Sequence, residues 1–345
     1  MAVREKIGFA ILGAGMIADY HRQAVEANAD LGAELVAIGH YNPARFAEIS
    51  RKFGVPCLNQ TELLANPAVD VVCICTPSGQ HAEQTIAAAQ AGKHVLVEKP
   101  MALSLAEADA MIASCRQAGV KLGVTFQRRT ESPFPQMRAA VEAGDLGELT
   151  LGVVSMPYHR PQAYFNQADW RGTWAMDGGG VLMNQGIHLV DLLVWFMGDP
   201  VEVRAYGGTL QRHIEVEDTL AATLHFANGA MATITATTTA APGFPHRLEI
   251  YGTRGAIQVE GEAVGRWTLL NPAQARIEPV AVTQAADAGA GSDPRGIKAT
   301  GHMAIFRDFI QALRSDGRPL IDGVEGRRSL ATVLAIYQAA GLLPV

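Results

Sequence analysis

Residues 1–126 alternate short apolar runs with longer segments of helical spacing. Such alternation is typical of βαβ units, whose strands lie parallel in one sheet. Several runs are almost continuously apolar, as expected where helices cover both faces of the sheet. We therefore expect an α/β domain with a doubly wound parallel sheet over residues 1–126. The predicted strands cover residues 7–12, 34–39, 69–75, 94–97 and 121–126.

The pattern changes after Arg128 to β-rich sequence with hairpin signals. Asn228-Gly229 separates a predicted strand at 219–226 from one at 230–238, and Thr253-Arg254-Gly255 separates 248–251 from 256–259. An α+β domain is therefore expected over residues 127–345. Helices are predicted at 105–118, 134–143, 302–314 and 324–340, and a loop at 284–300.

The bulk composition fits a soluble globular protein of about two domains. The chain has 345 residues, of which 48% are hydrophobic and 18% charged, and 28 basic against 34 acidic residues give a net charge of −6. This charge does not indicate the basic surface that binding of nucleic acid requires. No segment approaches the ~18 consecutive apolar residues of a membrane-spanning helix. The basic start lacks a convincing cleavage site, so we expect a cytoplasmic protein. The four cysteines lack the paired spacing of a zinc site, and no metal is expected.

A glycine-rich turn follows the first predicted strand and opens a helical segment. Its sequence is Gly13-Ala14-Gly15-Met16-Ile17-Ala18. Gly13 would permit the tight turn, Gly15 would let the backbone approach a pyrophosphate, and Ala18 would keep the helix close to the sheet. A glycine turn alone is a weak signal, but its place between the first strand and a helix favours dinucleotide binding. We predict that residues 13–17 contact the cofactor.

The second strand is followed by His40, where an NAD-binding enzyme usually carries an acidic residue for the ribose hydroxyls. His40 can donate to a ribose or, when protonated, to a 2′-phosphate, with help from Arg45. It can equally be a plain turn residue. The sequence therefore predicts NAD or NADP without choosing between them.

Two further motifs carry side chains suited to acid/base chemistry. Glu98-Lys99-Pro100 places Lys99 at the carboxyl end of a strand, the edge where ligands bind in open α/β sheets. Three glycines at 178–180 precede a helix-like run in which Asn184 and His188, four residues apart, share one face with Asp191. A histidine that titrates near neutrality can carry a hydroxyl proton, and a lysine can stabilise an alkoxide. A lone helical histidine is more often structural, so the combination of motifs carries the functional interpretation.

Together these motifs resemble the Gfo/Idh/MocA family of glucose-fructose oxidoreductase and inositol 2-dehydrogenase, over nearly the whole chain. The second motif runs Gly178-Gly179-Gly180-Val181-Leu182-Met183-Asn184-Gln185-Gly186-Ile187-His188, and further matching pieces are Cys75-Thr76-Pro77 with His81, Asp169-Trp170-Arg171 and Tyr337. The resemblance implies an NAD(P)-binding Rossmann domain followed by an α+β domain with a large, mostly antiparallel sheet. It also implies homo-oligomers, dimers or tetramers, and substrates that are sugars, cyclitols or their derivatives.

The resemblance also implies roles for individual residues. Lys99 and His188 would lie near the nicotinamide and the reacting carbinol, with His188 as acid/base and Lys99 assisting. Many relatives carry aspartate where this chain has Asn184, which can orient a substrate but cannot carry charge. Further contacts with the cofactor are expected from His40, Thr76, Pro77, His81, Glu98, Lys99, Gln127, Trp170 and Arg171.

These features favour an NAD(P)-dependent dehydrogenase or reductase acting on CH–OH groups of a small polyol or sugar. One alternative is a glycosidase that oxidises its sugar transiently with bound NAD. A second alternative is a non-catalytic regulator that senses nucleotide. The presence of both Lys99 and His188 favours the oxidoreductase, because a regulator needs only the glycine turn.

Overall fold

The computed structural model describes residues 5–283 and 299–343, and the chain divides into two units. The first unit contains the described parts of Met1–Gln127 and Lys298–Arg327, and the second those of Arg128–Ile297 and Arg328–Val345. The second domain predicted from the sequence covers all of residues 127–345. The structure instead places α9 (Thr300–Ser315) and the start of α10 (Gly323–Ala339) in the first unit.

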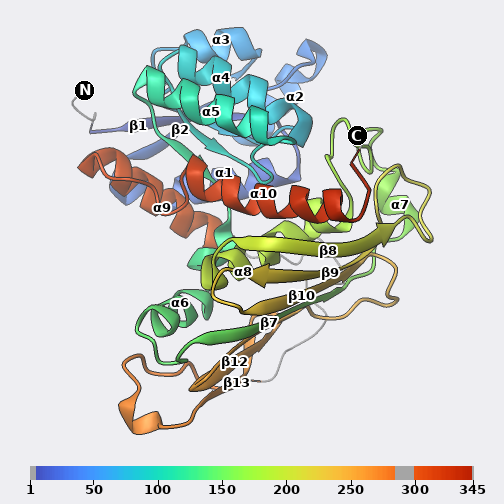
Figure 1. The fold of residues 1–345 in the computed structure, drawn as a ribbon. Coiled ribbons are helices and arrows are strands. Elements are labelled where there is room, and N and C mark those ends of the chain that lie inside the picture. The colour runs from blue at the N-terminus through green and yellow to red at the C-terminus, as the bar shows by residue number, and fades with distance from the viewer. Residues whose placement is uncertain (1–4, 284–298, 344–345) are drawn as a thin grey trace. The chain divides into compact units, whose positions relative to one another are not determined.

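A six-stranded parallel sheet organises the first unit (Figure 1). Its strand order is β3-β2-β1-β4-β5-β6, so the chain reverses its direction across the sheet between β1 and β4. In open α/β sheets, ligands bind at such a reversal, beside the carboxyl ends of the strands. The strands are β1 (Ile7–Leu12), β2 (Ala33–Gly39), β3 (Cys57–Leu58), β4 (Val71–Ile74), β5 (His94–Val97) and β6 (Leu122–Val124).

Helices cover both faces of this sheet (Figure 1). Helix α1 packs against α9 and α4 packs against α5, on opposite sides, because right-handed crossovers leave β1 and β4 in opposite directions. Helix α5 begins at a capping box, in which the Glu107 amide donates to Ser104 Oγ over 3.1 Å and the Ser104 amide to Glu107 Oε2 over 3.0 Å. The helices are α1 (Met16–Ala27), α2 (Phe46–Phe53), α3 (Gln60–Ala65), α4 (His81–Gln90) and α5 (Leu105–Ala118).

A seven-stranded, mostly antiparallel sheet organises the second unit, as expected. Its order is β13-β12-β11-β7-β10-β9-β8, and only β7 and β10 run parallel. Both predicted hairpins are confirmed, β9 with β10 and β11 with β12. The strands are β7 (Leu149–Pro157), β8 (Pro200–Gly208), β9 (Thr219–Phe226), β10 (Met231–Thr237), β11 (Arg247–Gly252), β12 (Gly255–Glu260) and β13 (Ala263–Leu269).

The second unit also contains α6 (Phe134–Glu142), α7 (Gln162–Phe165) and α8 (Ile187–Met197), and α8 packs against β7. A π-helical turn, Val181–Gly186, leads directly into α8. Short 3-10 helices cover Ala29–Leu31, Pro43–Arg45, Ser78–Gln80, Gln127–Thr130 and Pro272–Gln274. The loop expected at 284–300 lies outside the described residues apart from its last two. Within the described ranges, every helix is too short or too polar to cross a membrane.

Candidate functional site

The glycine turn between β1 and α1 has the shape that a dinucleotide pyrophosphate requires. Gly13 has a φ of +106°, and a Cβ there would lie 2.6 Å from the carbonyl oxygen of Cys75. A Cβ at Gly15 would meet nothing within 4 Å, so the backbone is open on that side. Helix α1 begins at Met16 without a side-chain cap, which leaves amide donors and the positive end of the helix dipole for an anion. These residues fit the phosphates of NAD or NADP.

His40 and Arg45, at the end of β2, are both engaged with neighbouring residues. His40 Nδ1 accepts from the Asn42 amide over 3.1 Å, and its ring stacks on Tyr41 at 4.7 Å. Arg45 pairs with Glu48 through Nη2 over 3.1 Å. A neutral imidazole that accepts at Nδ1 keeps its proton on Nε2, so His40 can still donate to a ribose hydroxyl. Its role toward the cofactor stays a prediction.

His81 links the ends of β4 and β5. Its Nε2 lies 2.9 Å from the Thr76 carbonyl oxygen and its Nδ1 lies 2.8 Å from the Pro100 carbonyl oxygen. Burial lowers the pKa of His81, while the two carbonyl contacts raise it. His81 is 1% exposed, and its two carbonyl contacts hold Thr76 and Pro100 in place at the sheet edge. Direct contact of Thr76, Pro77 and His81 with a cofactor stays a prediction.

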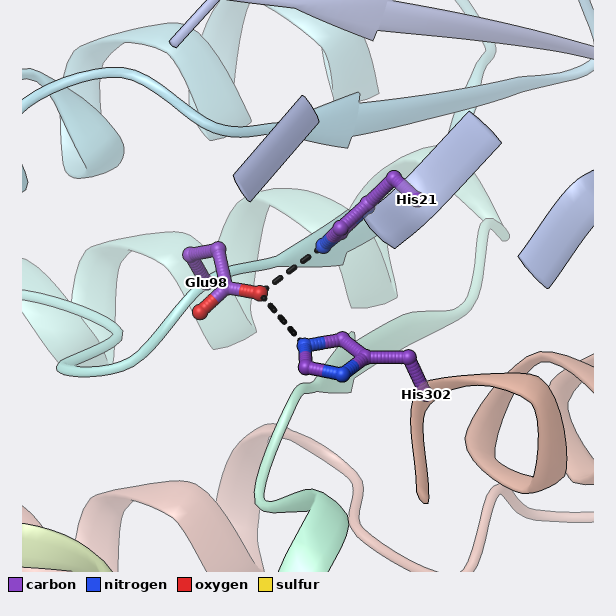
Figure 2. A group of neighbouring side chains, drawn as sticks. All are labelled: His21, Glu98 and His302. Atoms are coloured by element: carbon purple, nitrogen blue, oxygen red, sulfur yellow. Dashed lines mark hydrogen bonds and ion pairs between the residues drawn. The ribbon is translucent and has the colours of Figure 1, made fainter. Parts of the chain in front are cut away.

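Glu98 is the centre of a buried cluster that the sequence analysis did not anticipate (Figure 2). Its Oε1 lies 2.8 Å from His21 Nε2 in α1 and 3.5 Å from His302 Nε2 in α9. Burial would raise the pKa of Glu98, but the two imidazoles outweigh it and hold that pKa well below its ordinary value. Burial lowers the pKa of His21 more than Glu98 raises it. The cluster therefore holds an ionised carboxylate beside a neutral His21.

These three side chains are also the one group of possible metal ligands found among the described residues. Both imidazoles point their Nε2 atoms at the same oxygen of Glu98 (Figure 2). Metal ligation through Nε2 would put a proton on each Nδ1, and metal-bound histidines normally donate that proton to an acceptor. Neither Nδ1 has a hydrogen-bond partner among the described residues. The cluster therefore fits a hydrogen bond from His21 Nε2–H to the carboxylate, with His302 Nε2 in a longer contact of 3.5 Å, better than it fits a metal.

Lys99 directly follows Glu98, and its side chain is half-buried. The Lys99 amide donates to Glu98 Oε2 over 3.3 Å, so the carboxylate clamps the backbone that carries the lysine. Lys99 thus lies just beyond β5, at the carboxyl edge of the sheet that also carries the glycine turn. The structure places both motifs of the first unit at one edge of the sheet, as predicted.

In the second unit, the three glycines lead into the π-helical turn rather than directly into an α-helix. A Cβ at Gly180 would clash with the Glu217 carbonyl oxygen. The Glu217 carboxylate accepts from the amides of Gly180 over 2.8 Å and Leu182 over 2.9 Å, and from Tyr337 Oη over 2.7 Å. Burial raises the pKa of Glu217 to about 7, against the donors that lower it. Glu217 and Tyr337 therefore fix the start of this helix, a role that no local sequence signal indicates.

The π-helical turn changes how the residues of the second motif face. Asn184 lies in that turn, whereas His188 lies in the first turn of α8 and is 9% exposed. A π-turn rotates the chain less per residue than an α-turn, so α-helical spacing does not set how Asn184 faces relative to His188, whereas His188 and Asp191 are three residues apart within α8. Asp191 is fully buried and accepts from Arg129 Nε over 2.8 Å and Nη2 over 2.7 Å. Asp191 therefore lies on the same side of α8 as His188, and its carboxylate is bound by Arg129.

Trp170 and Arg171, predicted to contact the cofactor, lie in an aromatic group of the second unit. The Arg171 guanidinium carbon lies 4.7 Å from the Trp170 ring and 4.6 Å from the Tyr164 ring, and Nη1 donates to Tyr164 Oη over 2.8 Å. Gln127, in the first unit, is 5% exposed. Contacts of all three predicted residues with a cofactor stay predictions.

Comparison with protein families matches both units. Residues 7–126 match an oxidoreductase family with an NAD-binding Rossmann fold, and residues 134–258 match the GFO/IDH/MocA C-terminal domain. A myo-inositol 2-dehydrogenase from Thermotoga maritima is 32% identical over 256 residues, 72% of this chain and 73% of the relative. A 1,5-anhydro-D-fructose reductase from Ensifer adhaerens is 31% identical over 90% of this chain and 89% of the relative.

A solved structure is similar over the whole chain. The WlbA dehydrogenase from Bordetella pertussis, solved in complex with NADH and UDP-GlcNAcA, is 34% identical and superposes with a TM-score of 0.86. The match covers 99% of this chain and 99% of that one.

Proposed function

Because the chain belongs to the Gfo/Idh/MocA family of NAD-binding oxidoreductases, we propose that it transfers a hydride between a nicotinamide and a hydroxyl-bearing carbon of a sugar, cyclitol or sugar derivative. The observation that carries the proposal is the shared edge of the first sheet. The glycine turn follows β1 and Lys99 follows β5. A turn suited to bind a pyrophosphate and a lysine side chain therefore lie at the carboxyl ends of parallel strands of one sheet.

The proposed reaction separates the two hydrogens of a carbinol. A bound nicotinamide would supply the acceptor for the hydride that leaves carbon, and the imidazole of His188 would take the hydroxyl proton. Lys99 stabilises the negative charge that develops on the hydroxyl oxygen. In the reverse direction His188 returns the proton to the carbonyl oxygen. Asn184 orients the substrate.

For the substrate, we propose a sugar-type hydroxyl and place nucleotide-linked sugars first. The reason is that the WlbA dehydrogenase, which matches 99% of this chain, was solved with UDP-GlcNAcA. The myo-inositol 2-dehydrogenase matches a smaller share, 72% of this chain. Inositols and free sugars come next in the substrate panel.

The test compares the wild type with Lys99→Met and His188→Ala. Both variants should bind nucleotide with wild-type affinity and lose hydride transfer by at least about 100-fold, the usual contribution of a positioned acid or base. Lys6→Met and His225→Ala, at exposed positions, serve as matched controls and should keep full rates. Wild-type rates in either site variant would refute the assignment.

The same assay separates the alternative functions. A glycosidase would release product from a retained NAD without net reduced nicotinamide. A regulator would bind nucleotide and turn over no sugar. Either result would replace the oxidoreductase proposal.

A further inference from the structure

A buried carboxylate, that of Asp177, lies beside Asn184. Asp177 is 4% exposed, and its Oδ1 accepts from Asn184 Nδ2 over 2.6 Å. Its Oδ2 accepts from the Gly172 amide over 2.9 Å, and the Asp177 amide donates to the Thr173 carbonyl oxygen over 3.1 Å. Both the side chain and the backbone of Asp177 are therefore held in place.

The chemistry of this contact decides which way the Asn184 amide points. A carboxylate only accepts hydrogen bonds, so the NH2 group of Asn184 must face Asp177. The carbonyl Oδ1 of Asn184 then points elsewhere, and it accepts from Gln185 Nε2 over 3.2 Å. An asparagine without such a neighbour could present either end of its amide.

The glycine run explains how two residues seven apart come into contact. Residues 178–180 turn the chain back on itself, and Glu217 holds the amides of Gly180 and Leu182. Asn184 follows in the π-helical turn, with its amide donating to the Gly180 carbonyl oxygen over 2.9 Å. The geometry of this turn thus fixes both partners of the contact.

We propose that Asp177 is a positioning residue for the reaction and that it acts through Asn184. Asp177 fixes which end of the Asn184 amide faces it, and thereby sets how Asn184 can meet a substrate hydroxyl. It also places a negative charge within one hydrogen bond of Asn184, which lies four residues before His188 in the sequence. This inference rests on the proposed function for its catalytic part, whereas the side-chain pairing stands on the structure alone.

The test exchanges the two side chains. Asp177→Asn puts two amide groups face to face or flips Asn184, and Asn184→Asp puts two carboxylates in contact, which cannot both ionise. The double variant D177N/N184D restores a donor opposite a carboxylate, with the polarity reversed. Asn166→Asp, at an exposed position of the same unit, is the matched control.

Each single variant should lower kcat by about 10- to 100-fold at unchanged nucleotide affinity, and the double variant should return to within about tenfold of wild type. Melting temperatures should follow the same order and need no substrate. A double variant no more stable than the single ones overturns the pairing. Asp177→Asn at the wild-type kcat overturns the positioning role. A wild type that binds nucleotide but turns over no sugar refutes the proposed function, while the melting temperatures still decide the pairing.

Discussion

The ion pair between Arg129 and Asp191 should be a main support of α8, the helix that carries His188. Arg129 donates to Asp191 through two nitrogens at 2.8 Å and 2.7 Å, and each side chain is 1% exposed. Ser329 Oγ donates to Asp191 Oδ1 over 2.7 Å. Arg129→Met therefore leaves a carboxylate in the core without its guanidinium.

Breaking a buried pair from one side destabilises a protein by about 3–5 kcal/mol. In a unit of this size, each kcal/mol lowers the melting temperature by roughly 2–4 °C, so Arg129→Met should lower it by about 6–20 °C. Arg204→Met is the matched control, because Arg204 meets Glu202 at the same 2.7 Å with side chains 81% and 53% exposed. An exposed pair contributes about 0–1 kcal/mol, because water screens it.

Differential scanning calorimetry of the two variants against wild type measures both shifts. The double variant R129M/D191L should recover most of the loss, because an apolar pair of similar volume replaces a buried ion pair at little cost. Equal shifts for Arg129→Met and Arg204→Met would refute the reasoning, since burial would then not decide the strength of the pair.

Three further predictions concern the cluster around Glu98, the carboxylate of Glu217 and the glycine turn. Glu98→Ala removes the carboxylate that accepts from His21 Nε2 and lies 3.5 Å from His302 Nε2, and it should cost about 3–5 kcal/mol in denaturant unfolding; a loss below about 1 kcal/mol would contradict the cluster. The pKa of Glu217 is about 7 in the folded protein and 4.5 in the unfolded chain. Its contribution to the free energy of unfolding, on the order of 3 kcal/mol, should therefore be lost as the pH rises from 4.5 to about 7. In Glu217→Gln, the melting temperature should lack this part of its dependence on pH. Gly15→Ala should be as stable as wild type and should bind nucleotide more weakly in titration calorimetry. Gly13→Ala should also lose stability, because its Cβ would meet the Cys75 carbonyl oxygen. Equal stability of the two variants would argue against this geometry of the turn.

Elements with local signals were predictable from the sequence. Strand β1 and helix α5 begin and end where expected, because the signals for both lie in neighbouring residues. For β1 the signal is an apolar run before a glycine turn, and for α5 it is a capping box. The hairpin at Asn228-Gly229 was predictable for the same reason. Strand β3 was missed, because two residues at a sheet edge leave no periodic pattern.

Contacts between distant segments were not predictable. His302 joins His21 and Glu98 only because α9 packs against α1, and no pattern in the last fifty residues indicates this. Glu217 and Tyr337 fix the start of the helix that carries His188, although they are 120 residues apart in the sequence. The departure at Asn184 was visible in the sequence, but its partner Asp177 became visible only when the glycine run was seen to fold back.

The decisive measurement of hydride transfer is nicotinamide absorbance after the purified protein is mixed with NAD or NADP and a panel of UDP-linked sugars, inositols and free sugars. We expect reduced nicotinamide with at least one sugar in the wild type and none above background in His188→Ala or Lys99→Met, although both variants bind the nucleotide. A wild type that binds neither nucleotide, or variants that reduce it at the wild-type rate, would contradict the account.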